Sequence, residues 1–294
     1  METEKPRPFL IVPFPHIFPS FVTDYITCFH SNSMAYAIVT GGSRGIGLEI
    51  AKQLAGRGFD LILIARNGAD LEKAKKGIEA EFGTKATIIP KDLSKRNAVA
   101  GIHSQINKMK INVEILVNNA GYGDYGKFGE IPWEKLEGEM ELNNVALVHM
   151  VKLFLPEMLA RKSGKILNLS STAAFQPGPL MAVYYATKAF VLSFSQALSC
   201  ELEGSGVTIS ALCPGVTNTL FNARAGLGKS RVTENAMMEP DWAAKIGVDG
   251  LFAGKRVVIP GLRNKIGAKL VRIMPEGIVL KAVKKIMEKR KRAG

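Results

Sequence analysis

The sequence predicts an α/β fold built on a doubly wound parallel sheet of about seven strands. Short, uninterrupted apolar runs alternate along the chain with amphipathic stretches, and a glycine-rich turn directly follows the first run. Strands of a parallel sheet are buried on both faces and therefore appear as continuous apolar runs, whereas the helices that cover the sheet carry one apolar stripe each. The alternation indicates βαβ units and a single Rossmann-like domain.

The apolar runs are the predicted strands, and the stretches between them are predicted helices. The strands are expected at residues 37–39, 61–64, 86–89, 113–117, 165–169, 207–212 and 257–259. Apolar residues recur at fourfold spacing after the glycine turn, and longer amphipathic patterns predict helices over 70–82 and 133–161. Composition does not shift between these elements, so residues 34–261 are expected to form one domain.

Residues 1–33 differ from the rest of the chain. Basic residues precede an apolar run over 9–22, as in a signal peptide, but three prolines interrupt this run. We expect a flexible or surface-packed extension. A membrane-associating arm and a cleaved signal are the second and third alternatives, and a natural start at Met34 is a further one.

The basic charge is concentrated in a C-terminal tail, residues 262–294. The net charge of the chain is +13, and this tail holds eleven Lys and Arg residues against two Glu. Its second half predicts an amphipathic helix with an apolar stripe opposite four lysines. Such a helix can lie on an anionic membrane or dock on a partner subunit. Packing of the stripe against the domain is the alternative, and nucleic-acid binding is disfavoured because the tail lacks aromatic residues for base stacking.

The cysteines and histidines predict neither disulfides nor a metal site. Cys28, Cys200 and Cys213 are far apart, odd in number and form no C-x-x-C pair, which favours a reducing, cytoplasmic location. The four histidines have no ligand spacing. We therefore expect no bound metal.

The glycine turn at residues 40–47 is a candidate phosphate-binding site. Gly41, Gly45 and Gly47 stand where the first predicted strand meets the first predicted helix. Glycine lets the backbone approach a pyrophosphate closely, and the first N–H groups of a helix can bind an anion. The position after strand one therefore predicts a dinucleotide site.

Two arginines favour NADP(H) over NAD(H). An acidic residue at the end of strand two would bind a free ribose 2′-hydroxyl, but the chain has Arg66 there and Arg44 in the glycine turn. Guanidinium groups can bind a 2′-phosphate through paired hydrogen bonds. The alternative is that both arginines are ordinary solvated residues.

Tyr184 and Lys188 form a candidate general acid/base pair. They are four residues apart in a predicted helix and therefore share a face. A nearby ammonium group favours the phenolate, which suits proton transfer to and from an alcohol. For an isolated pair, core packing beside a solvated lysine is the better interpretation, so the assignment depends on the surrounding motifs.

Those motifs resemble the short-chain dehydrogenase/reductase family. They are the glycine turn at 40–47, Asp92 with Leu93, the run Asn118, Asn119, Ala120 and Gly121, then Ser171, Tyr184 with Lys188, and Pro214, Gly215 and Thr219. Their order and spacing match the family from residue 35 to about residue 261. The N-terminal extension and the basic tail are outside the resemblance.

The resemblance implies a role for each matching residue. Asn143 would hold a relay water and Ser171 would position the substrate, with Asn144 and Ser170 as the alternatives one residue away. The implied catalytic set is Asn143, Ser171, Tyr184 and Lys188. The cofactor set is Thr40, Gly41, Ser43, Arg44, Gly45, Ile46, Gly47, Arg66, Asp92, Leu93, Asn119, Ala120, Gly121, Tyr184, Lys188, Pro214, Gly215 and Thr219.

The function implied is NADPH-dependent reduction of a hydrophobic ketone or aldehyde. Tyr184 would protonate the developing alkoxide, and Ser171 would donate a hydrogen bond to the carbonyl oxygen. Apolar walls are expected from Phe175, Leu180, Tyr185, Phe221 and the methionines of a lid over 219–239. The alternatives are an oxidative alcohol dehydrogenase and a non-catalytic cofactor-binding scaffold. The resemblance also implies a homodimer or homotetramer.

Overall fold

The computed structural model describes residues 35–221, 225 and 237–292. The predicted N-terminal extension and residues 222–224 and 226–236 of the predicted lid lie outside the described residues. The chain divides into two units, Met1–Ser33 and Met34–Gly294, so the helices that follow residue 261 belong to the same unit as the sheet.

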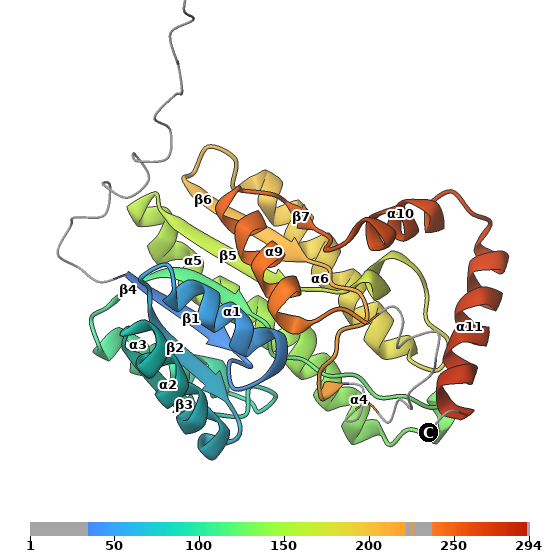
Figure 1. The fold of residues 1–294 in the computed structure, drawn as a ribbon, viewed down its shortest axis with the longest axis horizontal. Coiled ribbons are helices and arrows are strands. Elements are labelled where there is room, and N and C mark those ends of the chain that lie inside the picture. Colours follow the sequence, from blue (N-terminus) through green and yellow to red (C-terminus); the bar gives the residue numbers. More distant parts are fainter. Residues whose placement is uncertain (1–34, 222–224, 226–236, 293–294) are drawn as a thin grey trace, which may run out of the picture. The chain divides into compact units, whose positions relative to one another are not determined.

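A seven-stranded parallel sheet forms the centre of the second unit, which confirms the predicted fold class (Figure 1). The strand order is β3-β2-β1-β4-β5-β6-β7. The strands are β1 Ala35–Thr40, β2 Asp60–Ala65, β3 Ala86–Pro90, β4 Asn112–Asn118, β5 Gly164–Leu169, β6 Val207–Leu212 and β7 Val257–Val258. The order reverses between β1 and β4, and ligands of such sheets bind beyond the carboxyl ends of the strands at that point.

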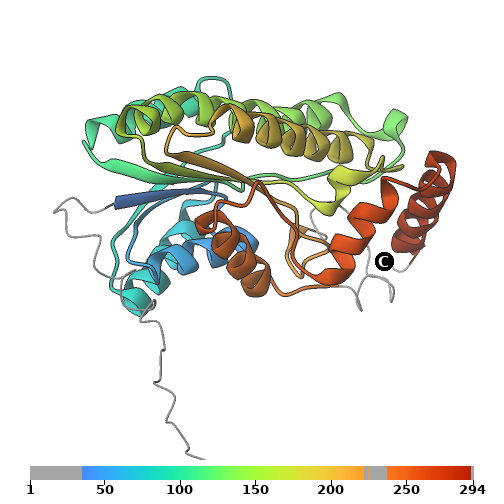
Figure 2. The same cartoon turned by 90° about the horizontal axis from the view of Figure 1, so that it is seen from above.

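Helices cover both faces of the sheet (Figure 2). Leu54 of α1, Leu71 of α2 and Val248 of α9 pack in the core on one face, while Ile102 of α3, Phe154 of α5 and Val191 of α6 pack on the other. The helices are α1 Gly45–Ala55, α2 Gly68–Phe82, α3 Ala98–Lys108, α4 Trp133–Met140, α5 Leu147–Arg161, α6 Ala182–Glu201 and α9 Pro240–Phe252, with short 3-10 turns at Phe128–Glu130 and Thr172–Phe175. Alternate residues of each strand serve the two cores, which explains the continuous apolar runs.

The helix predicted over residues 133–161 contains a π-helical segment. Helix α4 continues through the π-helix Glu141–Ala146 into α5 without a break. An i→i+5 turn inserts one extra residue and is frequent at functional sites. Hydrophobic periodicity does not distinguish this segment from an ordinary α-helix, and the candidate relay residue Asn143 lies within it.

The basic tail forms two helices, α10 Leu262–Val271 and α11 Glu276–Arg292, which lie together at one end of the sheet (Figures 1 and 2). The apolar stripe of α11 is divided between two environments. Val279, Val283 and Met287 are buried against the domain, whereas Ile278 and Ile286 are exposed. Among the described residues, no helix has the length and hydrophobicity to cross a bilayer.

Candidate active site

The carboxyl ends of β1 and β4 are held together by one threonine. The Thr40 hydroxyl donates a hydrogen bond to the Val117 carbonyl (3.2 Å) and accepts from the N–H groups of Asn119 (2.9 Å) and Ala120 (3.0 Å). Thr40 is itself buried. The glycine turn after β1 and the Asn-Ala-Gly segment after β4 are therefore positioned together at the reversal point of the sheet.

The glycine positions of the turn leave no space for a side chain. Gly41 and Gly45 have positive φ angles of 68° and 56°, which glycine adopts without strain. A Cβ atom on Gly47 would overlap both the Gly41 carbonyl oxygen and the Asn119 side-chain amide. The amino terminus of α1 can thus bring its backbone N–H groups close to an anion such as a pyrophosphate.

Thr219 closes the other side of this turn. A Cβ on Gly45 would lie 3.2 Å from the Thr219 methyl carbon, so the segment after β6 contacts the glycine turn. Pro214 precedes this segment and accepts a hydrogen bond from the Thr172 N–H group (2.9 Å). The structure therefore brings the predicted cofactor residues of β1, β4 and β6 to one edge, where Ser43 and Ile46 are half-buried.

Of the two arginines predicted to bind a 2′-phosphate, Arg66 directly follows β2 and Arg44 directly precedes α1. Arg44 is exposed and forms an ion pair with Asp70 (2.5 Å). Burial acts to raise the pKa of Asp92, but hydrogen bonds from Ser94 and the charges of Arg66 and Lys95 outweigh it and lower the pKa. Asp70 was missed by the sequence analysis, which considered only the residue at the strand end for an acid.

Lys188 is buried beside Tyr184. Its ammonium group donates a hydrogen bond to the Leu169 carbonyl (3.0 Å) and lies 5.8 Å from the centre of the Tyr184 ring. Only 4% of Lys188 is exposed. Burial lowers its pKa to about 8, and the negative charge of Glu139 opposes that shift.

Asn143 lies next to this pair. Its side chain donates to the Tyr122 carbonyl (2.8 Å) and the Thr187 hydroxyl (3.1 Å), and it accepts from the Tyr122 N–H group (3.1 Å). A Cβ on Gly121 would lie 2.9 Å from the Asn143 side-chain oxygen and 3.3 Å from the Lys188 nitrogen. A side chain at residue 121 would therefore crowd both the Asn143 amide and the Lys188 ammonium group, and glycine avoids this.

The neighbouring asparagine and serine alternatives occupy different positions. Asn144 donates to the Thr187 carbonyl (3.0 Å). Ser170 is buried, and its hydroxyl donates a hydrogen bond to the Lys188 carbonyl of α6 (2.8 Å). Its O–H group is therefore already paired and does not point to a substrate. Ser171 is half-buried, and its oxygen accepts from the Ala173 N–H group, which leaves its own O–H available as a donor.

Glu139 is a buried acid that the sequence analysis missed. It is fully buried one helical turn before Asn143, and one carboxylate oxygen accepts from the Asp124 N–H group (3.1 Å). The other oxygen has no hydrogen-bond partner within the described part of the chain. Burial, supported by the charge of Asp124, raises its pKa to about 7, against the lowering effect of that hydrogen bond and of Lys188. The i, i+4 spacing to Asn143 was the available signal.

We expect Glu139→Gln to stabilise the protein selectively at high pH. Because folding raises the pKa of Glu139 from 4.5 to about 7, its contribution favours the fold at low pH and is lost as pH rises through 7. Thermal denaturation should show a Tm gain over wild type that is larger at pH 8.5 than at pH 5.5 by about 3 °C or more. The exposed Glu137→Gln on the same helix is the control, and an equal Tm difference at both pH values would contradict the assignment.

An apolar cluster packs against Tyr184. Leu180, Tyr185 and Phe221 belong to it, as predicted, and α11 contributes Val283 and Met287. Phe175 was predicted in this wall, but it packs instead against the cluster around Leu192 and Cys213.

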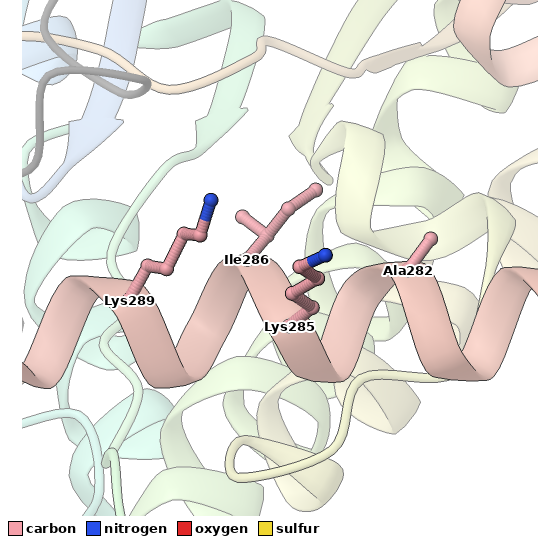
Figure 3. A pocket seen from close by; sticks show the side chains of 4 residues that line it. All are labelled: Ala282, Lys285, Ile286 and Lys289. Atoms are coloured by element: carbon pink, nitrogen blue, oxygen red, sulfur yellow. The ribbon is translucent and has the colours of Figure 1, made fainter.

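Helix α11 is held in place over this cluster. The Tyr125 hydroxyl donates a hydrogen bond to the Met287 carbonyl (3.1 Å). A cavity of about 260 Å³ lies beside a different face of α11, the face that carries the exposed residues Ala282, Lys285, Ile286 and Lys289 (Figure 3). The tail is therefore part of the wall around the candidate acid/base pair.

Comparisons with known proteins agree with this geometry. The family model described as short chain dehydrogenase matches residues 35–230. The chain is 34% identical over 217 residues to the very-long-chain 3-oxoacyl-CoA reductase of Laccaria bicolor, which covers 72% of this chain and 62% of that protein. It is 35% identical over 183 residues to the fatty acyl-CoA reductase of Acinetobacter baylyi, covering 60% of each. The match thus spans less than two thirds of these relatives' length.

A solved structure is similar over most of the chain. The short-chain dehydrogenase from Sphingobium yanoikuyae, determined in complex with NADPH, superposes with a TM-score of 0.73 at 31% identity. The match covers 83% of this chain and 97% of that one.

Among the described residues, no group of three or more His, Cys, Asp or Glu side chains could hold a metal ion.

Proposed function

The chain belongs to the short-chain dehydrogenase family, and we propose that it is an NADPH-dependent reductase of a long, hydrophobic carbonyl compound, with a 3-oxoacyl thioester as the leading candidate. Membership makes it an oxidoreductase that uses a nicotinamide cofactor. The observation that carries the proposal is the grouping of Asn143 and Lys188 at Gly121 with Tyr184 at the nearby Gly123, where the Tyr184 ring packs against an apolar cluster. The glycine turn, in which Gly41 and Gly47 leave no room for a side chain, fits the pyrophosphate of a dinucleotide.

The protein's own contribution to the reaction is proton transfer and alignment. A nicotinamide cofactor held at the glycine turn would supply the hydride for the carbonyl carbon. Tyr184 donates its phenolic proton to the oxygen on which negative charge grows, and Ser171 donates a hydrogen bond to the same oxygen. Lys188 stabilises the phenolate left behind, because its ammonium group lies over the Tyr184 ring.

Asn143 and Glu139 complete the proposed path for protons. A π-helical segment at Asn143 disrupts the regular i→i+4 hydrogen bonds, so a backbone carbonyl there can bind a water molecule. Glu139 lies one turn before Asn143 on the same continuous helix, with one buried carboxylate oxygen that lacks a protein partner among the described residues. In the proposed path, the water near Asn143 and the Glu139 carboxyl group pass a proton back to Tyr184 after each reaction.

The preference for NADPH is assigned to Arg44 and Arg66. Arg66 directly follows β2, Arg44 lies in the glycine turn after β1, and the similar Sphingobium yanoikuyae enzyme was solved with NADPH. We expect the double change Arg44→Ala with Arg66→Ala to raise the KM for NADPH at least about tenfold and to leave the KM for NADH nearly unchanged. Arg57→Ala, which removes an ion pair with Asp249 elsewhere, is the control.

Asp70 provides a second, opposite test of the same site. Because Asp70 pairs with Arg44, it competes with a 2′-phosphate for the guanidinium group. Asp70→Asn should therefore lower the KM for NADPH by about threefold or more, by freeing that cation. Equal effects of all these variants on NADPH and NADH would show that neither arginine reads the phosphate.

The substrate class is inferred from the apolar wall and from the names of the relatives. Tyr185, Phe221 and Met287 surround Tyr184 with apolar surface. The relatives at about 35% identity are named for reduction of long acyl-CoA compounds. An NADPH oxidation assay with 3-oxoacyl thioesters of increasing length should show kcat/KM rising by up to about fourfold per buried methylene.

Two outcomes of that assay would favour the alternatives. Faster turnover of the corresponding alcohols with NADP⁺ at physiological pH would favour an oxidative dehydrogenase. Cofactor binding without turnover of any carbonyl, including aldehydes, steroids and small diketones, would favour a cofactor-binding scaffold. Binding of neither cofactor would remove the reductase proposal itself.

Assembly and location are further parts of the proposal. Val145, Leu159 and Phe190 are exposed apolar side chains on the long helices that carry Asn143 and Tyr184, which supports a homodimer or homotetramer. Light scattering should then give two or four times the chain mass of 31.9 kDa. A cytoplasmic location is proposed from the scattered cysteines, of which Cys213 is buried as a free thiol.

A further inference from the structure

Helix α10 presents large apolar side chains to solvent. Leu262, Ile266, Leu270 and Ile273 are 73%, 55%, 47% and 80% exposed, respectively. We call these four residues the α10 ridge. Leu262, Ile266 and Leu270 recur every four residues and share one face of α10, and Ile273 lies in the turn that directly follows the helix. A continuous row of exposed aliphatic side chains is unusual on a soluble surface and marks an interaction site.

The orientation of α10 is the reverse of that of an ordinary surface helix. The side of α10 that packs on the domain carries Asn264, Ala268 and Val271. Asn264 is fixed there by a hydrogen bond from its amide to the Pro260 carbonyl (2.8 Å). The helix therefore cannot rotate its larger aliphatic side chains inward without losing these contacts.

Cationic side chains border the α10 ridge. They are Arg263, Lys265, Lys269 and Arg272, all of them exposed. The tail to which they belong carries eleven basic residues against two acidic ones. Two copies of this face would repel each other, whereas an anionic lipid surface would attract both its charge and its aliphatic side chains.

We propose that α10 docks on an anionic membrane surface, with the α10 ridge inserted at the headgroup level and the flanking basic residues on lipid phosphates. The membrane contact expected of the second half of the tail, α11, is thereby moved to α10. The buried stripe of α11 faces the domain, so α10 provides the lipid-facing surface. Each basic residue near such a surface should strengthen binding by a factor of about five.

The proposed docking surface adjoins the candidate active site. Val271 of α10 and Met274, just beyond it, belong to the same apolar cluster as Tyr184 and Met287. On the proposed function, the docked face would hold this cluster and Tyr184 close to a carbonyl compound dissolved in the bilayer. The membrane contact itself does not depend on that function.

Flotation of the purified full-length chain with lipid vesicles tests the proposal. Vesicles of phosphatidylcholine with about one third phosphatidylserine should bind the chain, and pure phosphatidylcholine or about 0.5 M salt should weaken binding at least about tenfold. Leu270→Glu with Ile273→Glu should abolish binding, and Lys265→Glu with Lys269→Glu should lower it at least about tenfold. Deletion of the tail is not a suitable test, because α11 forms part of the wall around Tyr184.

Matched controls separate docking from general effects of charge. Trp133→Glu introduces an acid at another exposed apolar residue, and Lys73→Glu with Lys76→Glu makes the same charge change on α2. All variants should reduce a water-soluble carbonyl at wild-type rates without vesicles, so a failed reductase proposal would be seen separately. Full vesicle binding by the α10 variants would overturn the inference. So would a change in oligomeric state caused by Leu270→Glu with Ile273→Glu, because a second copy would then cover the ridge.

Discussion

Replacing Tyr184 with Phe is expected to lower kcat for carbonyl reduction by about three orders of magnitude, because general acid catalysis contributes roughly 10² to 10⁴. The substitution removes one oxygen and keeps the ring, which packs against Tyr185 and Phe221. The affinity for NADPH, measured by fluorescence titration, should therefore stay within about threefold of wild type. This combination separates loss of a proton donor from loss of the binding site.

Tyr185→Phe is the matched control for that experiment. Tyr185 is the next residue, and its hydroxyl lies near the Met287 sulfur (4.0 Å) in the apolar cluster. Its replacement should change kcat by less than about threefold, since it donates no proton in the proposed reaction. A large loss of kcat with Tyr185→Phe and a small loss with Tyr184→Phe would show that Tyr185, and not Tyr184, is the general acid.

Replacing Lys188 with Met should remove at least about a thousandfold of activity while preserving the fold. Lys188 is almost fully buried, and burial lowers its pKa, which means that the folded protein holds this charge at a cost. Methionine has a similar length and no charge, so Tm should stay the same or rise. The affinity for NADPH should fall about tenfold if Lys188 also contacts the nicotinamide ribose.

The paired readout of activity and Tm makes the Lys188 experiment decisive. A clear fall in Tm would show that the bond from Lys188 to the Leu169 carbonyl mainly supports the fold. Lys165→Met, at a half-buried lysine near the Phe252 ring, controls for loss of one positive charge and should leave kcat unchanged. Normal turnover by Lys188→Met would exclude it from the catalytic machinery.

Much of the fold could be predicted because strands buried on both faces appear as continuous apolar runs. The run at 37–39, for example, lies inside β1, where Ala37, Ile38 and Val39 are fully buried. The edge strand β7 is only two residues long and ends at Val258, one residue before the end of the predicted apolar run at 257–259. The π-helical segment at Asn143 was invisible because it continues the apolar period of its neighbours.

The candidate site was predictable where a motif depends on local spacing, and unpredictable where distant segments meet. Tyr184 and Lys188 share one helical turn, so the sequence alone pairs them. The packing of Met287 against Tyr185 joins segments about one hundred residues apart, which no periodicity reports. Glu139 was missed for a related reason, since its hydrogen-bond partner is the Asp124 N–H group in a separate loop.

The most direct test of the central claim is transfer of deuterium from NADPH labelled at the nicotinamide C4 position. Wild-type protein, a long-chain 3-oxoacyl thioester and each of the two C4-labelled forms of NADPH would be incubated, and the product analysed by mass spectrometry. Hydride transfer predicts a 3-hydroxyacyl product with one deuterium on the carbinol carbon from one of the labelled forms, and almost none with Tyr184→Phe in the same time. An oxidised cofactor without deuterium on that carbon from either form would contradict the account.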